Sequence, residues 1–258
     1  MTTVTVVGCG NMGSAIVKGL ARAGNHEVSA ADPDTDALEM VEPYAAVTAT
    51  DAAEVTDTEI VFVAVKPHLV GDVVDSLELD ADQTLVTIAA GVPVEFVAER
   101  TDATVVRIMP NLAAETGDMA AAVTWDEPDT DLAAVLDDLG AFVEIDEDLM
   151  DVATALNGSG PAFVFYLLQA MKQGAVAEGL SDEQAETLAV QTFVGAAETV
   201  RHDDRSLDEL IDAVCSPNGT TIEGMDVLWD SDADEAVADA LAAAAERSAE
   251  LAKESSDD

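Results

Sequence analysis

One stretch decides the fold: Val4-Thr5-Val6-Val7-Gly8-Cys9-Gly10-Asn11-Met12-Gly13, in which a short apolar run leads directly into the pattern Gly-x-Gly-x-x-Gly. The pattern predicts a strand, a tight turn and a helix from Ser14 to Ala23. In a dinucleotide-binding turn the first glycine permits the bend, the second lets the backbone approach a diphosphate, and the third lets the helix pack closely on the strand. We therefore predict that residues 8–13 bind a diphosphate at the start of the helix, with an ordinary glycine turn as the alternative.

An acidic residue stands where a dinucleotide-binding fold needs one. Residues 26–31 predict a second strand, and Asp32 follows about 20 residues after the last glycine, where a carboxylate can accept hydrogen bonds from the adenosine ribose hydroxyls. Acidic residues are abundant in this chain, so a solvated surface acid is the alternative interpretation. No Lys or Arg occurs between Arg22 and Lys66, so a ribose 2′-phosphate would meet no cation from this segment. The segment favours NADH over NADPH.

The composition indicates a folded protein with a very acidic surface. The 258 residues are 49% hydrophobic, which is ample for a buried core, and the net charge is −43 with only 10 Lys and Arg residues. This charge disfavours nucleic acid and anionic membrane surfaces as partners. Because concentrated salt would screen the repulsion between these acids, we expect a halophilic source and a cytoplasmic location.

Neither a targeting segment nor a metal site is visible in the sequence. The first residues begin a strand directly, and the longest apolar run, residues 161–168, is too short to span a bilayer. The two cysteines, Cys9 and Cys215, lack the spacing of metal ligands. We predict free thiols in a reducing compartment and no bound metal.

Alternating strands and helices predict a parallel sheet in the first half of the chain. Three apolar runs rich in β-branched residues, 59–65, 84–90 and 104–109, fit strands buried on both faces. Residues 117–145 are expected to add two strands around a helix at 131–142. We assign an α/β fold in which a Rossmann-type dinucleotide-binding domain occupies residues 1–146.

Strand signals stop after this point, and the remaining residues, 147–258, predict an all-helical substrate and dimerisation domain. The expected helices are 149–156, 162–179, 181–199, 207–214 and 234–253. Ser181 and Gln184 form a capping signal at the start of one of them. The helices have more apolar surface than one small bundle needs, so we expect packing between subunits in a homodimer or higher homo-oligomer.

Small or polar residues follow the carboxyl ends of the predicted strands, where ligands bind in doubly wound sheets. Lys66-Pro67 follows the strand at 59–65, Ala89-Ala90-Gly91 follows the next strand, and Asn111 follows the strand at 104–109. An exposed turn residue is the alternative interpretation of Lys66.

Two loops in the second half also suit a ligand. Asn157-Gly158-Ser159-Gly160-Pro161 leads into a helix with proline in its first turn, so its backbone N–H groups could converge on an anion. The loop 215–221 contains several hydroxyls and opens a helix near Thr221. A simple linker and an ordinary capped turn are the respective alternatives.

Six segments together closely resemble the pyrroline-5-carboxylate reductases, in the family's order from residue 4 to about residue 225. The segments are Gly8-Cys9-Gly10-Asn11-Met12-Gly13, Ala64-Val65-Lys66-Pro67, Ile88-Ala89-Ala90-Gly91-Val92, Met109-Pro110-Asn111, Gly158-Ser159-Gly160-Pro161-Ala162 and Ser216-Pro217-Asn218-Gly219-Thr220-Thr221. Each is weak by itself, whereas six in the right order are specific.

The resemblance implies reduction of 1-pyrroline-5-carboxylate to L-proline, the last step of proline biosynthesis, by a reduced nicotinamide cofactor. By similarity, the substrate carboxylate would bind the backbone of Asn218, Gly219, Thr220 and Thr221, and the Thr221 hydroxyl would be the catalytic group at the ring nitrogen. The resemblance further implies that the cofactor contacts Gly8, Cys9, Gly10, Asn11, Met12, Gly13, Ala64, Val65, Lys66, Pro67, Ala89, Ala90, Gly91 and Asn111, in addition to Asp32, which is assigned from its position after the second predicted strand. In this family NADPH is common and the substrate loop comes from the second subunit.

Several positions depart from the family pattern without removing a group that the mechanism requires. They are Leu112, Ala113, Asn157, Phe163, Ile211 and Asn218, where Thr, Pro, Ser, Tyr, a basic residue and Gly are usual. Two alternatives to the implied activity are another imine or β-hydroxyacid reductase of the same architecture and a non-catalytic dinucleotide-binding sensor. A β-hydroxyacid enzyme should carry a Lys general acid on the first helix after the glycine loop, which offers only Lys172.

Overall fold

The computed structural model describes residues 1–256, which form two compact units. The first unit runs from Met1 to Ser159 and also includes the chain from Ala242 on, whereas the second is Gly160–Leu241. The predicted fold class is confirmed, because a sheet covered by helices is followed by a helical region. The domain border that we placed after residue 146 lies inside the first unit and stays a prediction.

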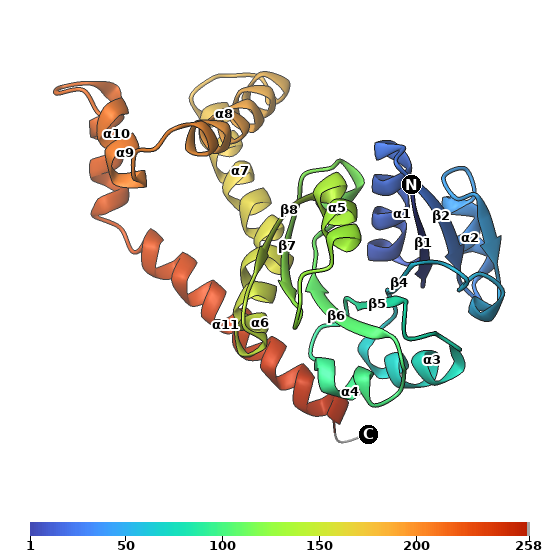
Figure 1. The fold of residues 1–258 in the computed structure, drawn as a ribbon. Helices are drawn as coiled ribbons and strands as arrows, with labels where there is room; N and C mark the ends of the chain where they lie inside the picture. The colour runs from blue at the N-terminus through green and yellow to red at the C-terminus, as the bar shows by residue number, and fades with distance from the viewer. Residues whose placement is uncertain (257–258) are drawn as a thin grey trace. The chain divides into compact units, whose positions relative to one another are not determined.

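An eight-stranded sheet forms the centre of the first unit, in the order β3-β2-β1-β4-β5-β6-β7-β8 (Figure 1). Its strands are β1 (Thr2–Val7), β2 (His26–Ala31), β3 (Val47–Ala49), β4 (Ile60–Val63), β5 (Thr84–Thr87), β6 (Thr104–Met109), β7 (Met119–Thr124) and β8 (Gly140–Glu144). All neighbouring strands are parallel except β6 and β7. This pair is antiparallel because only the short η3 (Leu112–Glu115) connects it, and a parallel crossover needs a dozen or more residues.

Helices cover both faces of the sheet with separate apolar layers. The helices α1 (Asn11–Ala23), α2 (Thr35–Val41) and α5 (Thr130–Leu139) pack on one face, and α3 (Val70–Ser76) and α4 (Val94–Ala98) pack on the other. The apolar strand β4 serves both layers: Phe62 points into the first, and its neighbours Val61 and Val63 point into the second, all fully buried. The continuous apolar run in the sequence thus reflects a strand without a solvent face.

Two predicted helices differ from the structure. The helix expected at 131–142 ends at Leu139, and β8 begins at Gly140, where a Cβ would overlap the backbone of Met119 on the neighbouring strand. The helix expected at 149–156 is divided into η4 (Glu147–Leu149), α6 (Met150–Ala153) and the π-helical turn η5 (Thr154–Ser159). The π-helical turn ends the first unit.

The second unit is helical, as predicted. It contains α7 (Gly160–Ala177), α8 (Asp182–His202), α9 (Leu207–Val214), α10 (Thr220–Trp229) and the first part of α11 (Ala233–Ser256). The predicted cap of α8 is confirmed, because the Ser181 hydroxyl accepts a hydrogen bond from the Gln184 backbone N–H and the Gln184 side chain accepts one from the Ser181 N–H. Among the described residues, no helix has both the length and the apolar character to cross a membrane.

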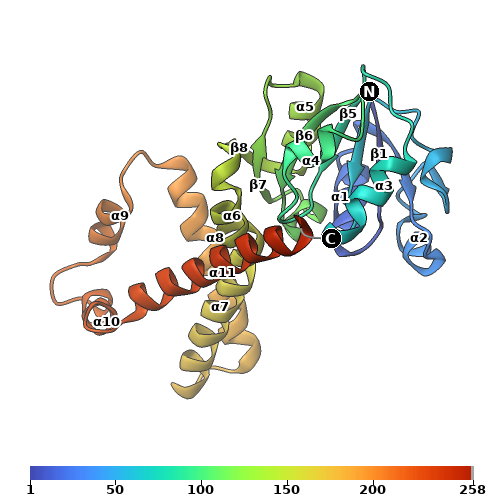
Figure 2. The same ribbon diagram turned by 90° about the horizontal axis from the view of Figure 1, so that it is seen from below.

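The last part of α11 belongs to the first unit and runs beside α6 (Figure 2). Ser248 is only 4% exposed, and its hydroxyl donates a 2.7 Å hydrogen bond to Asp151 Oδ1. This contact joins residues far apart in the sequence, immediately before the π-helical turn.

Candidate functional site

The turn between β1 and α1 depends on its glycines. Gly8 has φ +95°, and a Cβ there would lie 2.7 Å from the Ala64 carbonyl oxygen; a Cβ at Gly13 would overlap the Gly8 carbonyl oxygen. Both positions therefore exclude larger residues for steric reasons. Gly10 is exposed, and no atom lies within 4 Å of where its Cβ would be. The open side of Gly10 is the direction from which a ligand could approach the backbone.

The start of α1 offers free donors to such a ligand. Gly10 is the N-cap residue, no side chain caps the helix, and its first turn contains no acidic residue. Asn11 is exposed and Met12 partly exposed in this turn. Because the first N–H groups of a helix have no partners within it and the positive dipole end is uncompensated, the turn suits an anion such as the diphosphate of a dinucleotide.

Asp32 connects this turn to the end of β2. Its Oδ2 accepts a 2.6 Å hydrogen bond from the Cys9 backbone N–H, and its Oδ1 accepts a 2.8 Å hydrogen bond from the Asp34 backbone N–H. A carboxylate has about four acceptor sites, so two remain for ribose hydroxyls. Burial, with a smaller contribution from the Asp32 charge, raises the pKa of the Cys9 thiol to about 12, so the thiol stays neutral beside the turn.

The strand ends bring further predicted residues to the same edge of the sheet. Val7 pairs with Val63, and Val63 with Thr87, so the segments that follow β1, β4 and β5 leave the sheet side by side. This register places Ala64 to Pro67 next to the glycine turn and Ala89 to Gly91 one strand further along the same edge. Lys66 is exposed and forms no ion pair with another residue of the range 1–256.

Asn111, after β6, is held by Asn157 in a way that the sequence did not reveal. The Asn111 Nδ2 donates to the Asn157 carbonyl oxygen at 3.1 Å, and the Asn157 Nδ2 donates to the carbonyl oxygens of Met109 at 2.5 Å and Ala120 at 2.9 Å. The two amides thus join the end of β6, the start of β7 and the π-helical turn. The sequence marked Asn157 as the first residue of a glycine loop and as a departure from the family, and neither observation predicted these contacts.

The sequence reasoning also missed an ion pair of a buried arginine near this edge. Arg107 on β6 is 5% exposed, and its Nη1 lies 3.0 Å from Glu147 Oε1, which also accepts a 2.8 Å hydrogen bond from the Val94 backbone N–H at the start of α4. Arg107 is a basic residue inside an apolar strand, and a buried charge needs a partner of opposite charge. This feature of the sequence could have predicted an ion pair, although not its partner.

The predicted substrate loop lies in the second unit, before α10. Asn218 adopts φ +59°, and the Gly219 N–H donates to the Ser216 carbonyl oxygen at 2.9 Å. Gly219 is the N-cap of α10 and no side chain caps this helix, so the N–H groups in the turn of Thr220 and Thr221 are available to an anion. The Thr221 side chain is exposed and does not serve as the cap.

Lys172, the one candidate for a β-hydroxyacid mechanism, is occupied in the second unit. Its Nζ lies 2.8 Å from Asp182 Oδ2 and 2.5 Å from Glu186 Oε2. Hydrogen bonds to Asp182 and then Glu186 raise the pKa of this ammonium. A general acid needs a pKa near the working pH, so these contacts disfavour proton donation by Lys172.

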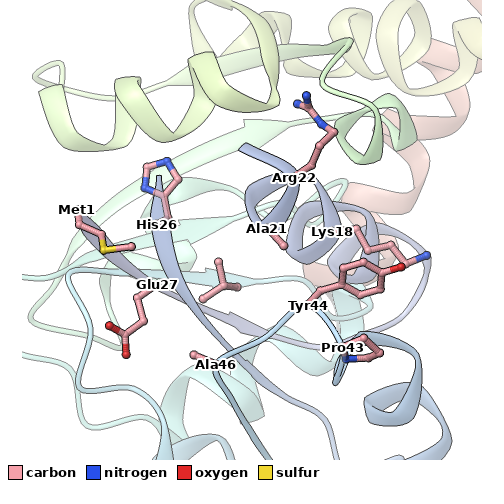
Figure 3. Close-up of a pocket in the computed structure, with 10 residues that line it drawn as sticks. Met1, Lys18, Ala21, Arg22, His26, Glu27, Pro43, Tyr44 and Ala46 are labelled. Atoms are coloured by element: carbon pink, nitrogen blue, oxygen red, sulfur yellow. The ribbon is translucent and has the colours of Figure 1, made fainter. Parts of the chain in front are cut away.

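A cavity also lies elsewhere in the first unit, at the amino ends of β1 and β2 (Figure 3). It measures about 570 Å³ and is lined by residues that include Lys18, Arg22 and His26. Its cations are engaged with protein groups: Lys18 Nζ lies 3.3 Å from Glu115 Oε1, and Arg22 Nη2 donates to the Asp138 carbonyl oxygen at 3.0 Å. Ligands of doubly wound sheets bind at the opposite edge, so we do not include this cavity in the site.

Two family models match the chain. Residues 147–251 match the model described as pyrroline-5-carboxylate reductase dimerisation. Residues 3–91 match the model described as NADP oxidoreductase, coenzyme F420-dependent.

Curated proteins and solved structures match over nearly the whole length. The pyrroline-5-carboxylate reductase of Methanosarcina acetivorans is 36% identical, covering 96% of this chain and 97% of the relative, and that of Escherichia coli is 34% identical with the same coverage. Among solved structures, the pyrroline-5-carboxylate reductase of Coxiella burnetii is 29% identical with a TM-score of 0.87, and the NADP-bound enzyme of Plasmodium falciparum is 26% identical with a TM-score of 0.83. Each comparison covers 97% of this chain and 98% of the other.

Proposed function

Because the chain belongs to the pyrroline-5-carboxylate reductase family, we propose that it reduces 1-pyrroline-5-carboxylate to L-proline with a reduced nicotinamide dinucleotide. The observation that carries the proposal is the edge of the sheet where the uncapped start of α1, Asp32 and the ends of β4, β5 and β6 meet. The open side of Gly10 fits a diphosphate, and the acceptor sites left on Asp32 fit a ribose. These features support a dinucleotide cofactor independently of the substrate.

The substrate is proposed to bind the loop before α10. The free N–H groups at the start of that helix suit the carboxylate of a small ring, and the positive φ of Asn218 gives the loop the bend that directs them to one point. The exposed Thr221 hydroxyl would donate a hydrogen bond at the ring nitrogen and assist its protonation. When bound, the reduced nicotinamide supplies the hydride that adds to the imine carbon, and the electron pair of the C=N bond takes the proton at nitrogen. The protein mainly holds the reactants at reacting distance.

The preferred cofactor is proposed to be NADH, with NADPH still used. Asp32 is already bound to two backbone N–H groups, so its negative charge is held at the position where a 2′-phosphate would come. Asp34 and Asp36 follow, and residues 23–65 contain no Lys or Arg. The relative from Plasmodium falciparum, in contrast, has NADP bound. The proposed preference of this chain for NADH therefore needs a direct comparison of the two cofactors.

The catalytic unit is proposed to be a homodimer or a higher homo-oligomer in which one subunit supplies the substrate loop to the other. The dimerisation model covers residues 147–251, and the helices of this region leave large apolar side chains exposed. Phe165 on α7 is 67% exposed, Tyr166 71% and Leu188 on α8 58%. Side chains of this kind on neighbouring helices are typical of subunit interfaces.

Turnover of synthetic 1-pyrroline-5-carboxylate by the purified protein in concentrated salt tests the proposal. We expect oxidation of NADH or NADPH that depends on the substrate, with L-proline as product. A β-hydroxyacid with NAD⁺ or NADP⁺ serves as the comparison reaction. Activity only in the comparison reaction would favour a related reductase, and cofactor binding without turnover would favour a dinucleotide sensor.

A further inference from the structure

We propose that Asn157 is a positioning residue for hydride transfer: its side-chain amide holds the Met109-Pro110-Asn111 segment in the geometry that the nicotinamide needs. This inference rests on the proposed function. It concerns a residue that replaces the serine usual in the family and that lies outside the segments expected to touch the cofactor.

The Asn157 amide joins two strands from a third segment. Its Nδ2 donates to the carbonyl oxygen of Met109, the last residue of β6, and to that of Ala120 at the start of β7. These acceptors lie at 2.5 and 2.9 Å, so both N–H groups of one amide are used. The pairing of β6 with β7 ends at Met109 and Ala122, and beyond it the chain forms the connection that contains η3. The amide therefore fixes the distance between the two strands at the end where this connection joins them.

The orientation of this amide is determined by its neighbours. Both atoms that face Nδ2 are carbonyl oxygens, which only accept, so the flipped amide would set Oδ1 against two acceptors. Asn157 Oδ1 is buried and has no hydrogen-bond partner within residues 1–256. Asn157 is therefore held by its donor side alone, and its contribution depends on the two N–H groups.

Asn111 completes the connection in the reverse direction. Its Nδ2 donates to the Asn157 carbonyl oxygen, and its Oδ1 accepts hydrogen bonds from the backbone N–H groups of Ala113 at 3.2 Å and Ala120 at 3.4 Å. The segment between Met109 and Asn111 is thus tied at both ends to the π-helical turn. Single π-helical turns are frequent at functional sites, and here the turn carries the Asn157 backbone and side chain to the strand ends.

A serine at this position has one hydroxyl donor on a shorter side chain, so it cannot donate to both carbonyl oxygens at once. The two-donor amide therefore gives this chain a tighter β6 end than the usual residue would. Because a misplacement of about 1 Å can lower a rate roughly 100-fold, a small movement of this segment should reduce hydride transfer without preventing cofactor binding.

Asn157→Asp tests the proposal, because the two side chains have almost the same shape. The substitution replaces the NH2 group, which donates two hydrogen bonds, with an acceptor oxygen that faces two carbonyl oxygens. We expect kcat to fall roughly 10- to 100-fold at saturating substrate and cofactor. The dissociation constant of the reduced cofactor, measured by its fluorescence, should change less than about threefold. The primary deuterium isotope effect with the 4-deuterated cofactor should rise, because hydride transfer becomes more rate-limiting. Asn157→Ser should recover part of kcat.

Asn25→Asp is the matched control. The Asn25 Nδ2 also donates to an oxygen, Asp138 Oδ2 at 2.9 Å, but it does so at the opposite edge of the sheet. This variant should keep kcat within about twofold and leave the isotope effect unchanged. If Asn157→Asp does not fold, Asn157→Ala removes the same donors without adding a charge and is expected to show the same split between kcat and cofactor affinity.

Three outcomes overturn the inference. Unchanged kcat and isotope effect in the Asn157 variants of an active protein would show that the amide does not position the reacting groups. Equal loss in Asn25→Asp would show a general effect of destabilisation. A wild-type protein without turnover would reject the proposed function, and this role with it, so the two failures are distinguished by the wild-type assay.

Discussion

The Cys9 backbone N–H donates a 2.6 Å hydrogen bond to the Asp32 carboxylate, and this bond connects the end of β2 to the glycine turn after β1. The same carboxylate accepts a second hydrogen bond, from the Asp34 backbone N–H. Asp32 is therefore expected to have two effects. It holds the turn through its acceptor atoms, and its charge is expected to oppose a 2′-phosphate.

Asp32→Asn tests the effect of the charge on cofactor choice, because it removes the charge, and its single amide oxygen keeps one of the two hydrogen bonds to the backbone. We expect the wild type to prefer NADH, and the variant to shift the ratio of kcat/KM for NADH over NADPH roughly tenfold toward NADPH, which corresponds to about 1.4 kcal/mol. Both cofactors are measured at one salt concentration, because salt screens the repulsion. Asp32→Ser should shift the ratio in the same direction.

Asp102→Asn, an exposed acid before β6, is the control and should leave the cofactor ratio unchanged. A clear NADPH preference of the wild type that survives both Asp32 substitutions would show that Asp32 does not read the ribose.

Thr221→Ala should lower kcat/KM for 1-pyrroline-5-carboxylate about 10-fold or more, because a hydrogen bond to a charged group contributes about 1.5–3 kcal/mol. Cofactor affinity should barely change. Ser231→Ala, which removes a hydroxyl bound to the Leu228 carbonyl oxygen at the other end of α10, should keep full activity. Full activity of Thr221→Ala would remove Thr221 from the proposed mechanism; the Thr221 side chain does not cap α10.

The protein should sediment as a dimer or larger assembly in molar salt and dissociate or unfold as salt is lowered. The net charge of −43 is screened within ~3 Å at 1 M salt but acts over ~10 Å at 0.1 M. Sedimentation velocity across a salt series measures the change. A stable, active monomer at low salt would contradict both the halophilic assignment and the shared active site.

Phe165→Ser should weaken the assembly in molar salt, because this exposed aromatic on α7 is expected to be buried between subunits. Met40→Ser is the control, since Met40 is 56% exposed but belongs to the first unit. An equal effect of the two substitutions, or none, would place the interface elsewhere.

Cys9 should resist alkylation in the folded protein. Its pKa, raised from 9.0 to about 12 mainly by burial, leaves roughly 10³-fold less thiolate than an ordinary thiol at any pH well below 9. The thiolate, and with it the reaction, appears only as pH rises toward 12. Peptide mapping after iodoacetamide treatment between pH 7 and pH 9 measures the labelling.

A Cys215→Ser variant isolates the Cys9 signal, because these are the two cysteines of the chain. It should take up label only after unfolding. Labelling of Cys9 in the folded variant at the rate of free cysteine would show that the turn after β1 opens in solution.

The sequence by itself determined the strand, turn and helix around Gly8 to Gly13, because each of these features depends on neighbours within a few residues. The same holds for the Ser181 cap and the buried strand β4, whose apolar run has no polar face. The order of six short segments also identified the family, since the order of segments is itself sequence information.

Only the tertiary structure decided that β7 runs antiparallel to β6 and that Arg107 pairs with Glu147. It alone also decided the contacts of Asn157, whose amide meets carbonyl groups 48 and 37 residues away along the chain. An asparagine side chain has the same donors in a loop, in a helix cap or between two strands, and every residue has a backbone carbonyl group. Their partners are therefore chosen by how the strands and the π-helical turn pack, a long-range property that no local pattern records.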